Sequence, residues 1–167
     1  MADRPAFEDI YREFLGRIYA YVRSQVGEAA DAEDITAQVF MNAYQAYGRF
    51  EARNTTPAAW LFRIARNATL DHFRSSTRRE RLRRTIERQP MAEEDPAERA
   101  EERIRYRALL AHVAELPERQ RDAISLRHSG LRFDEVGSLL GCSEDAAKML
   151  YHRALKALKE AVQRQET

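Results

Sequence analysis

The sequence predicts an all-α protein of two small helical domains joined by an acidic linker. Apolar residues recur at spacings of three and four along several long segments, the pattern of helices that bury one face. No stretch alternates apolar and polar residues over the length of a strand. Residues 90–95 combine a proline with a run of acids, a composition typical of a linker. We therefore expect domains at 1–89 and 101–167, with the linker at 90–100 keeping them apart.

The first domain begins with two amphipathic helices. Apolar residues spaced by three and four start at Phe7, and Gly27 ends this first segment. Asp31 is placed to cap a second helix, because its carboxylate can accept hydrogen bonds from the free N–H groups of the first turn. This second helix is expected to run to about Tyr47.

A polar loop at 48–55 leads into the most informative helix of the chain. Thr56 and Pro57 are a start signal, a capping hydroxyl followed by a ring fixed at helical φ. Its apolar face includes Trp60, which we assign to the core. The helix is expected to fade after Arg74, and residues 78–89 either extend it or lie loose.

The second domain reads as four shorter helices. Leu116-Pro117 interrupts the pattern once, and Gly141-Cys142-Ser143 forms a tight turn in which Ser143 caps the last helix. A helix, a short turn with glycine and a longer helix rich in Lys and Arg form the helix-turn-helix pattern. The predicted helices span 96 to about 115, 117–130, 133–140 and 144 to about 163.

Charge is unevenly distributed along a chain whose net charge is only +1. Residues 1–50 hold five arginines and eight acids, residues 57–90 hold nine arginines and three acids, and residues 91–104 hold two arginines and six acids. The basic block covers the helix that starts at Thr56. A helix with an apolar inner face and an outer face rich in Arg and amide is suited to phosphates and bases.

Several functional classes are excluded by the composition. Cys142 is the single cysteine, so no intramolecular disulfide forms and a reducing cytoplasm is expected. We expect no membrane insertion, because no apolar run is long enough to span a bilayer and the N-terminus lacks a signal-peptide pattern. Histidines and the cysteine lack metal-ligand spacing, and no nucleophile–base set or phosphate loop is present. We predict no metal, no cofactor and no enzymatic activity.

Runs of residues in both domains match one known family in the same order along the chain. In the first domain they are Asp31-Ala32-Glu33-Asp34-Ile35-Thr36-Ala37-Gln38-Val39-Phe40 and Trp60-Leu61-Phe62-Arg63-Ile64-Ala65-Arg66-Asn67. In the second they are Leu116-Pro117-Glu118-Arg119-Gln120-Arg121, Gly130-Leu131, Glu135-Val136 and Leu140-Gly141-Cys142-Ser143. With these runs the chain resembles the bacterial extracytoplasmic-function (ECF) group of RNA polymerase sigma factors.

The resemblance implies an alternative sigma factor that binds core RNA polymerase and directs promoter-specific transcription initiation. Domain 1–89 would correspond to sigma region 2 and domain 101–167 to region 4. Core binding would fall on Asp31, Asp34 and Gln38, where Asp34 and Gln38 share one helix face.

The loop and the basic helix would recognise and melt the minus-ten element. Phe50 would wall or stack on a base flipped from the non-template strand, and Arg53 and Asn54 would bond its edges. Asn67 would face the same site from the helix, where contacts must offset the few kcal/mol that extruding a base costs. Phosphate contacts would come from Arg63, Arg66 and Arg74.

The last helix would enter the major groove of the minus-thirty-five element. Its contacts would be Lys148, His152 and Arg153, with Arg127 touching the DNA backbone from an earlier helix. Asp145 and Met149-Leu150 depart from the family's usual run, which leaves fewer basic residues on this helix.

The family also makes an anti-sigma factor a candidate partner, covering the basic helix, the core-binding face or both. The alternative function is a helix-turn-helix regulator that binds duplex DNA without core polymerase. It would use the first domain for dimerisation or sensing, which does not require an Arg-and-amide helix behind a polar loop.

Overall fold

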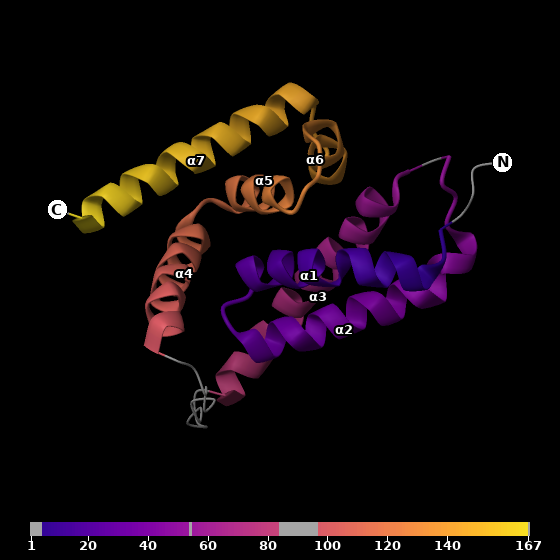
Figure 1. The fold of residues 1–167 in the computed structure, drawn as a ribbon, viewed down its shortest axis with the longest axis horizontal. Helices are drawn as coiled ribbons and strands as arrows, with labels where there is room; N and C mark the ends of the chain where they lie inside the picture. The colour runs from indigo at the N-terminus through magenta and orange to yellow at the C-terminus, as the bar shows by residue number, and fades with distance from the viewer. Residues whose placement is uncertain (1–4, 54, 84–96, 167) are drawn as a thin grey trace.

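A computed structural model of the 167-residue chain describes residues 5–53, 55–83 and 97–166. All elements in these ranges are helices, as predicted (Figure 1). The N-terminal unit contains α1 (Phe7–Gln25), α2 (Ala29–Ala46), the 3₁₀ helix η1 (Tyr47–Arg49) and α3 (Pro57–Arg83). The C-terminal unit contains α4 (Ala97–Glu115), α5 (Glu118–His128), α6 (Phe133–Leu140) and α7 (Glu144–Glu166).

The α1 and α2 helices pair through their apolar faces. Ile10, Phe14, Ile18 and Val22 recur every four residues along α1 and are buried. Each such side chain removed from water contributes about 1.5–3 kcal/mol, so the spacing alone directs which face of α1 turns inward.

The predicted capping role of Asp31 is wrong. The α2 helix starts at Ala29 with Glu28 at the N-cap position, and no side chain caps it. Asp31 therefore lies inside the first turn, where a carboxylate favours the positive end of the helix dipole. Its Oδ2 lies 3.9 Å from Nε2 of His72 on α3.

The start of α3 is confirmed, the expected fade after Arg74 does not occur, and the alternative in which later residues extend the helix holds as far as Arg83. The Thr56 hydroxyl accepts a hydrogen bond from the Ala59 N–H at 3.1 Å, as expected of an N-cap. The helix continues past Arg74 to Arg83. Ser75 does not interrupt it, because its hydroxyl donates to the His72 carbonyl at 3.0 Å and the following arginines are good helix formers.

The helix-turn-helix is confirmed, and α6 has the predicted bounds. Gly141 ends α6 with φ of 71°, a left-handed conformation that glycine adopts without steric cost. Ser143 then caps α7, because its hydroxyl accepts the Ala146 N–H at 3.1 Å. The α4 helix begins at Ala97, so residues 97–100 of the predicted linker are helical, and residues 90–96 lie outside the described ranges.

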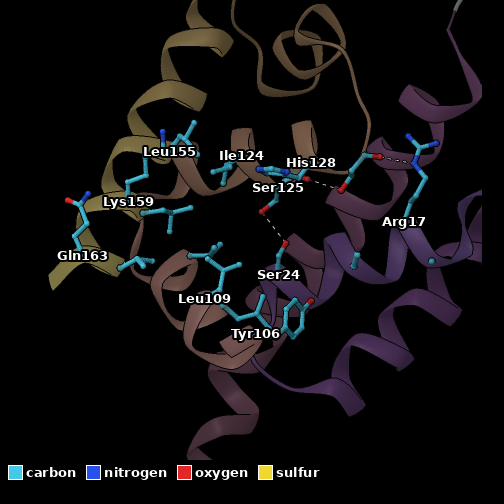
Figure 2. Close-up of a pocket in the computed structure, with 17 residues that line it drawn as sticks. Arg17, Ser24, Tyr106, Leu109, Ile124, Ser125, His128, Leu155, Lys159 and Gln163 are labelled. Atoms are coloured by element: carbon cyan, nitrogen blue, oxygen red, sulfur yellow. Dashed lines mark hydrogen bonds between the residues drawn. The ribbon is translucent and has the colours of Figure 1, made fainter. Parts of the chain in front are cut away.

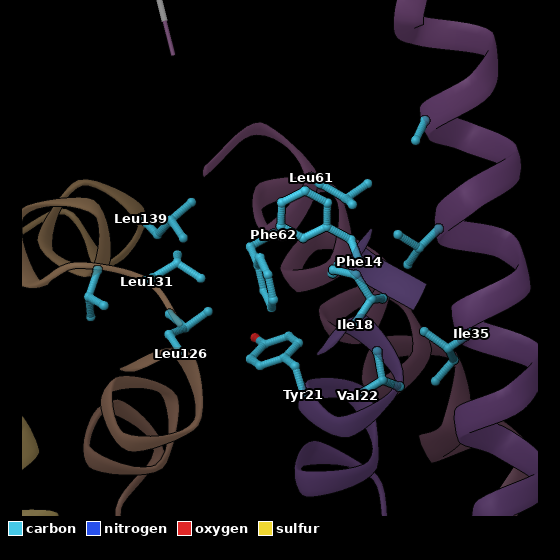
Figure 3. Close-up of a cluster of buried hydrophobic side chains, with 14 of the residues drawn as sticks. Phe14, Ile18, Tyr21, Val22, Ile35, Leu61, Phe62, Leu126, Leu131 and Leu139 are labelled. Atoms are coloured by element: carbon cyan, nitrogen blue, oxygen red, sulfur yellow. The ribbon is translucent and has the colours of Figure 1, made fainter. Parts of the chain in front are cut away.

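The two units are not kept apart, contrary to the expectation for the linker. They share one apolar core, in which Tyr21 and Phe62 of the N-terminal unit face Leu126, Leu131 and Leu139 of the C-terminal unit (Figure 3). The Tyr21 and Phe62 rings meet edge to face at 5.7 Å, and both are almost fully buried. Apolar residues on the inner faces of α1, α3, α5 and α6 therefore hold the chain in one packed body.

Candidate nucleic-acid interface

The exposed face of α2 carries two of the three residues predicted to bind polymerase. Asp34 and Gln38 lie one turn apart and are exposed, and the Gln38 side chain donates to Asn42 at 2.8 Å. Asp31 precedes them by one turn on the same side of the helix but is half-buried beside His72. The acidic and amide character of this face is therefore presented to solvent chiefly by Asp34 and Gln38.

The α3 helix presents a basic, amide-bearing face to solvent. Arg63, Asn67 and Arg74 are all exposed, and their spacing places them along one side. Asp71 lies on the same side, with its Oδ1 3.7 Å from the Arg74 guanidinium. Asp71 thus accompanies an arginine, and both side chains are exposed enough for the pair to be weak.

Arg66 is partly buried and points toward α5 instead of sharing the exposed face of Arg63, Asn67 and Arg74. Its Nε and Nη2 atoms both lie 3.4 Å from Oδ2 of Asp122 on α5. The Asp122 side chain is only 7% exposed. Burial raises the pKa of Asp122, and the neighbouring Arg66 cation partly offsets that rise.

Phe50 does not offer a free ring face to a base. It is 6% exposed and stacks on Tyr47, with ring centroids 6.0 Å apart and planes inclined by 11°. The centroid of the Trp60 ring lies 4.9 Å from that of Phe50, with the two ring planes inclined by 48°. Trp60 itself is half-buried against the core, as predicted. Sequence analysis missed this aromatic cluster of Tyr47, Phe50 and Trp60, because it depends on how η1 folds back onto α3.

The other loop residues are described only in part. Arg53 is exposed and lies 3.4 Å from the Glu51 carboxylate. Asn54 lies outside the described residues.

The predicted recognition face of α7 is open to solvent. Lys148, His152 and Arg153 are exposed, and Met149 beside them is 53% exposed. Lys148 pairs with Glu144 at 3.6 Å. This face is therefore mixed, with basic groups interrupted by an apolar side chain.

Arg127 is anchored at the turn between α5 and α6. Its guanidinium donates to the Leu131 carbonyl at 2.9 Å and lies 4.6 Å from the centre of the Phe133 ring. The Arg127 side chain is exposed. Phe133 in turn packs on Tyr151 of α7, which places Arg127 beside that helix.

An apolar groove of about 740 Å³ crosses the two units (Figure 2). Leu109 of α4, Ile124 of α5 and Leu155 of α7 line its floor and walls. The basic side chains among its lining residues are Arg17, His128 and Lys159, and the lining contains no Asp or Glu.

The described ranges contain no cluster of metal-ligating side chains and no apolar helix of membrane-spanning length. In residues 5–53, 55–83 and 97–166, no group of three His, Cys, Asp or Glu side chains is arranged to hold a metal ion. No helix in those ranges is long and apolar enough to cross a membrane.

Family models match both units. Residues 10–79 match the model of sigma-70 region 2, and residues 106–158 match that of sigma-70 region 4. The ECF RNA polymerase sigma factor SigF of Caulobacter vibrioides is 32% identical, over 92% of this chain and 86% of its own length. The RNA polymerase sigma factor CarQ of Myxococcus xanthus is 30% identical, over 93% of this chain and 88% of its own length.

A longer relative agrees with this assignment, and two solved structures share the fold. The ECF sigma factor BldN of Streptomyces coelicolor is 35% identical over 92% of this chain, which spans 59% of its length. The sigma factor RpoE in complex with the anti-sigma factor NepR from Bartonella quintana shares the fold, with a TM-score of 0.74, 23% identity and coverage of 94% and 96% of the two chains. CnrH in complex with the cytosolic domain of CnrY gives a TM-score of 0.71 at 21% identity, over 98% and 91%. The chain belongs to the ECF group of RNA polymerase sigma factors.

Proposed function

We propose that this sigma factor directs core RNA polymerase to promoters through three exposed faces on α2, α3 and α7. The observation that carries the proposal is the α3 face, where Arg63, Asn67 and Arg74 are exposed together within the region 2 match. The protein has no catalysis of its own in this scheme and acts in the cytoplasm, where polymerase and promoter DNA are found.

Core binding is assigned to α2. Asp34 and Gln38 are open to solvent on α2, a helix that packs against α1 and α3, so a polymerase surface can reach them. An acidic and amide face is complementary to a basic partner surface, which steers association and suppresses wrong partners. Asp31 is proposed to support this face through its contact with His72 rather than to bind directly.

Minus-ten recognition is assigned to the exposed side of α3 and the loop before it. Arg63 and Arg74 would neutralise phosphates, and Asn67 would hydrogen-bond an extruded base of the non-template strand. Phe50 is proposed as the support of the pocket wall, because its ring is buried under Trp60 and Tyr47. Arg53 and Asn54 remain proposed edge contacts.

Minus-thirty-five recognition is assigned to α7. Lys148, His152 and Arg153 would meet base edges and phosphates in the major groove of duplex DNA, and Arg127 would touch the backbone beside them. Met149, exposed among them, is suited to an apolar contact such as a thymine methyl group.

An anti-sigma factor is the proposed regulator. The Bartonella relative in fold was solved with such a partner. The groove between the units has apolar walls and cationic rim groups, so we propose that it accepts the apolar face of a helix flanked by acids. Because both units line the groove, a ligand bound there stabilises the packed arrangement.

Run-off transcription with purified core polymerase tests the proposal. The wild-type chain should create start sites that core polymerase alone lacks, whereas Asn67→Ala should lose open complexes and keep core binding. Arg63→Ala should lower the slope of log K against log salt by about 1, because one phosphate contact is lost. Arg12→Ala is the matched control, since it removes an exposed arginine from α1.

Two results would contradict the proposal. A chain that shifts duplex DNA as a dimer but gives core polymerase no new start site is a helix-turn-helix regulator. If Asn67→Ala abolishes core binding as well, Asn67 is structural.

A further inference from the structure

The exposed side of α7 carries an acid and an apolar residue among its basic groups. We infer that Asp145 and Met149 are the specificity-determining residues of this helix. They select a cytosine and, one or two base pairs away from it, a thymine in the minus-thirty-five element. This inference rests on the proposed function, since it names the bases that the helix-turn-helix unit reads.

The side of α7 that can face DNA is defined by the residues that the helix buries. The helix packs against α4, α5 and α6, and its buried residues are Ala147, Ala154 and Leu158. The opposite side carries four exposed residues at spacings of four, three and four, namely Asp145, Met149, His152 and Lys156. Because α7 lies at the edge of the molecule, this stripe is accessible to a duplex (Figure 1).

Asp145 and Met149 occupy the part of the stripe that reads bases. They lie in the first two turns of α7, and the N-terminal residues of a recognition helix are those that contact base edges. Four residues of helix advance about 6 Å, which corresponds to between one and two base-pair steps of about 3.4 Å. Lys148 and Arg153 are exposed on either side of the stripe, towards the phosphates that border the groove.

The carboxylate of Asp145 is free to accept a hydrogen bond from DNA. Within the ranges that the structure describes, it forms no hydrogen bond or ion pair, whereas its neighbour Glu144 lies 3.6 Å from the Lys148 ammonium group. A bare carboxylate in the groove is repelled by the phosphates, so its presence there is favourable only if the DNA supplies a donor. The major groove offers two such donors, the amino groups of cytosine and adenine.

Cytosine fits this carboxylate better than any other base. Guanine and thymine present the acceptors O6 and O4, which repel a carboxylate oxygen. Adenine presents its acceptor N7 beside its amino group, so that one carboxylate oxygen of Asp145 would face a lone pair. Cytosine presents its N4 amino group without such a neighbour on the same base, so Asp145 favours cytosine and disfavours the other three.

Met149 adds an apolar contact next to this hydrogen bond. Its side chain is 53% exposed and lies between Asp145 and His152 on the stripe. Thymine is the base whose major-groove edge carries a methyl group. A polar base edge pressed against the thioether would lose its water without gaining a partner, which disfavours the other bases at this position.

Binding of the holoenzyme to a promoter with single base replacements tests the inference. The promoter is one on which the wild-type chain and core polymerase create a start site, and each base pair of its minus-thirty-five element is replaced in turn. Wild-type holoenzyme should lose at least about five-fold in affinity when one particular cytosine is replaced. It should lose about two-fold when deoxyuridine, which lacks only the methyl group, replaces a thymine within two base pairs of that cytosine.

Substitutions should move these preferences in a defined way. Asp145→Asn should change the preferred base from cytosine to adenine, because an amide can bond both N6 and N7 of adenine. Asp145→Ala should lose the preference at that position and bind unrelated duplexes more tightly, since a negative charge is removed. Met149→Ala should bind the thymine and deoxyuridine promoters equally. Glu144→Gln is the matched control, because it removes an acid from the same turn and should leave every base preference unchanged.

The outcomes separate this inference from the proposed function. If Asp145→Asn keeps the wild-type preference at every position, Asp145 acts only on the helix dipole and its reading role is overturned. If deoxyuridine has no effect at any thymine of the element, the role of Met149 is overturned. In both cases the start sites remain and the sigma activity stands. A wild-type chain that gives core polymerase no start site overturns the proposed function, and this inference with it.

Discussion

At the scale of single residues, α3 presents Arg63 and Arg74 to solvent and turns Arg66 inward to the buried carboxylate of Asp122. Arg63, Asn67 and Arg74 could be placed on one exposed face from their spacing alone. The local sequence around Arg66 could not show that its side chain turns inward. Its partner Asp122 lies 56 residues away, and their contact depends on how the two units dock.

Phe50 shows the same limit in the loop. Its neighbours in sequence are polar, which suggested a ring free to stack on a base, but η1 turns it under Trp60. The burial of Phe50 depends on tertiary contacts, which the composition of the loop cannot predict.

We expect Phe50→Ala to destabilise the N-terminal unit by about 3–5 kcal/mol, the usual cost of deleting a buried phenyl ring. Phe50→Leu should cost markedly less, because it keeps most of the apolar volume. Urea denaturation of both variants measures the difference. Equal and negligible losses would show that the ring is not buried in solution and would reopen a direct stacking role.

At the scale of elements, capping and turn residues identified most boundaries. Thr56-Pro57, Leu116-Pro117 and Gly141-Cys142-Ser143 each mark a boundary that the structure confirms. The misplaced ends, at Asp31 and after Arg74, occurred where a capping residue type stands inside a helix. Asp, Ser and Thr are compatible with both positions, so their presence alone does not decide.

The turn of the helix-turn-helix depends on a glycine inside α6. A Cβ at Gly137 would lie 2.7 Å from the Cys142 carbonyl oxygen and 3.0 Å from that of Ser143, both backbone atoms. This close approach lets the chain reverse directly into α7.

Gly137→Ala should therefore lower the thermal stability of the C-terminal unit and weaken binding to duplex DNA. Gly16→Ala is the matched control, because Gly16 also lies within a helix and a Cβ there meets nothing within 4 Å. It should be neutral or stabilising by up to about 1 kcal/mol. Calorimetry of the two variants provides the comparison, and a Gly137→Ala protein as stable as the control would refute the packing argument.

At the scale of the whole molecule, the sequence pattern could not predict that the two units pack against each other. The acidic linker suggested separation, whereas buried residues on α1, α3, α5 and α6 form one core. Each unit has an apolar inner face by periodicity, but periodicity does not say whether that face meets its own unit or the other.

The packing of the two units against each other should depend on pH through Asp122. Burial raises the pKa of this carboxyl where the units are packed, although the neighbouring Arg66 cation partly offsets the rise. Separation of the units would return the pKa to its ordinary value near 4. The contribution of Asp122 to packing is thus greatest at a pH below that ordinary value and declines as the pH rises through the raised pKa.

Lowering the pH from 7 towards 5 should accordingly increase the fraction of molecules in which the two units are packed together, measured by energy transfer between labels on α2 and α7. Asp122→Asn should remove most of this dependence, because the amide does not titrate. A wild-type profile that is flat, or that shows the units separating on acidification, would contradict the raised pKa of the buried Asp122 carboxyl.

The central claim is that this chain directs core RNA polymerase to promoters through exposed faces on α2, α3 and α7. Run-off transcription on promoter DNA tests it most directly, measured for core polymerase alone, for core polymerase with the wild-type chain and for core polymerase with Asn67→Ala. We predict start sites with the wild-type chain that core polymerase alone lacks, and a loss of open complexes with core binding retained for Asn67→Ala. No new start site with the wild-type chain, or loss of core binding together with open complexes in Asn67→Ala, would contradict the account.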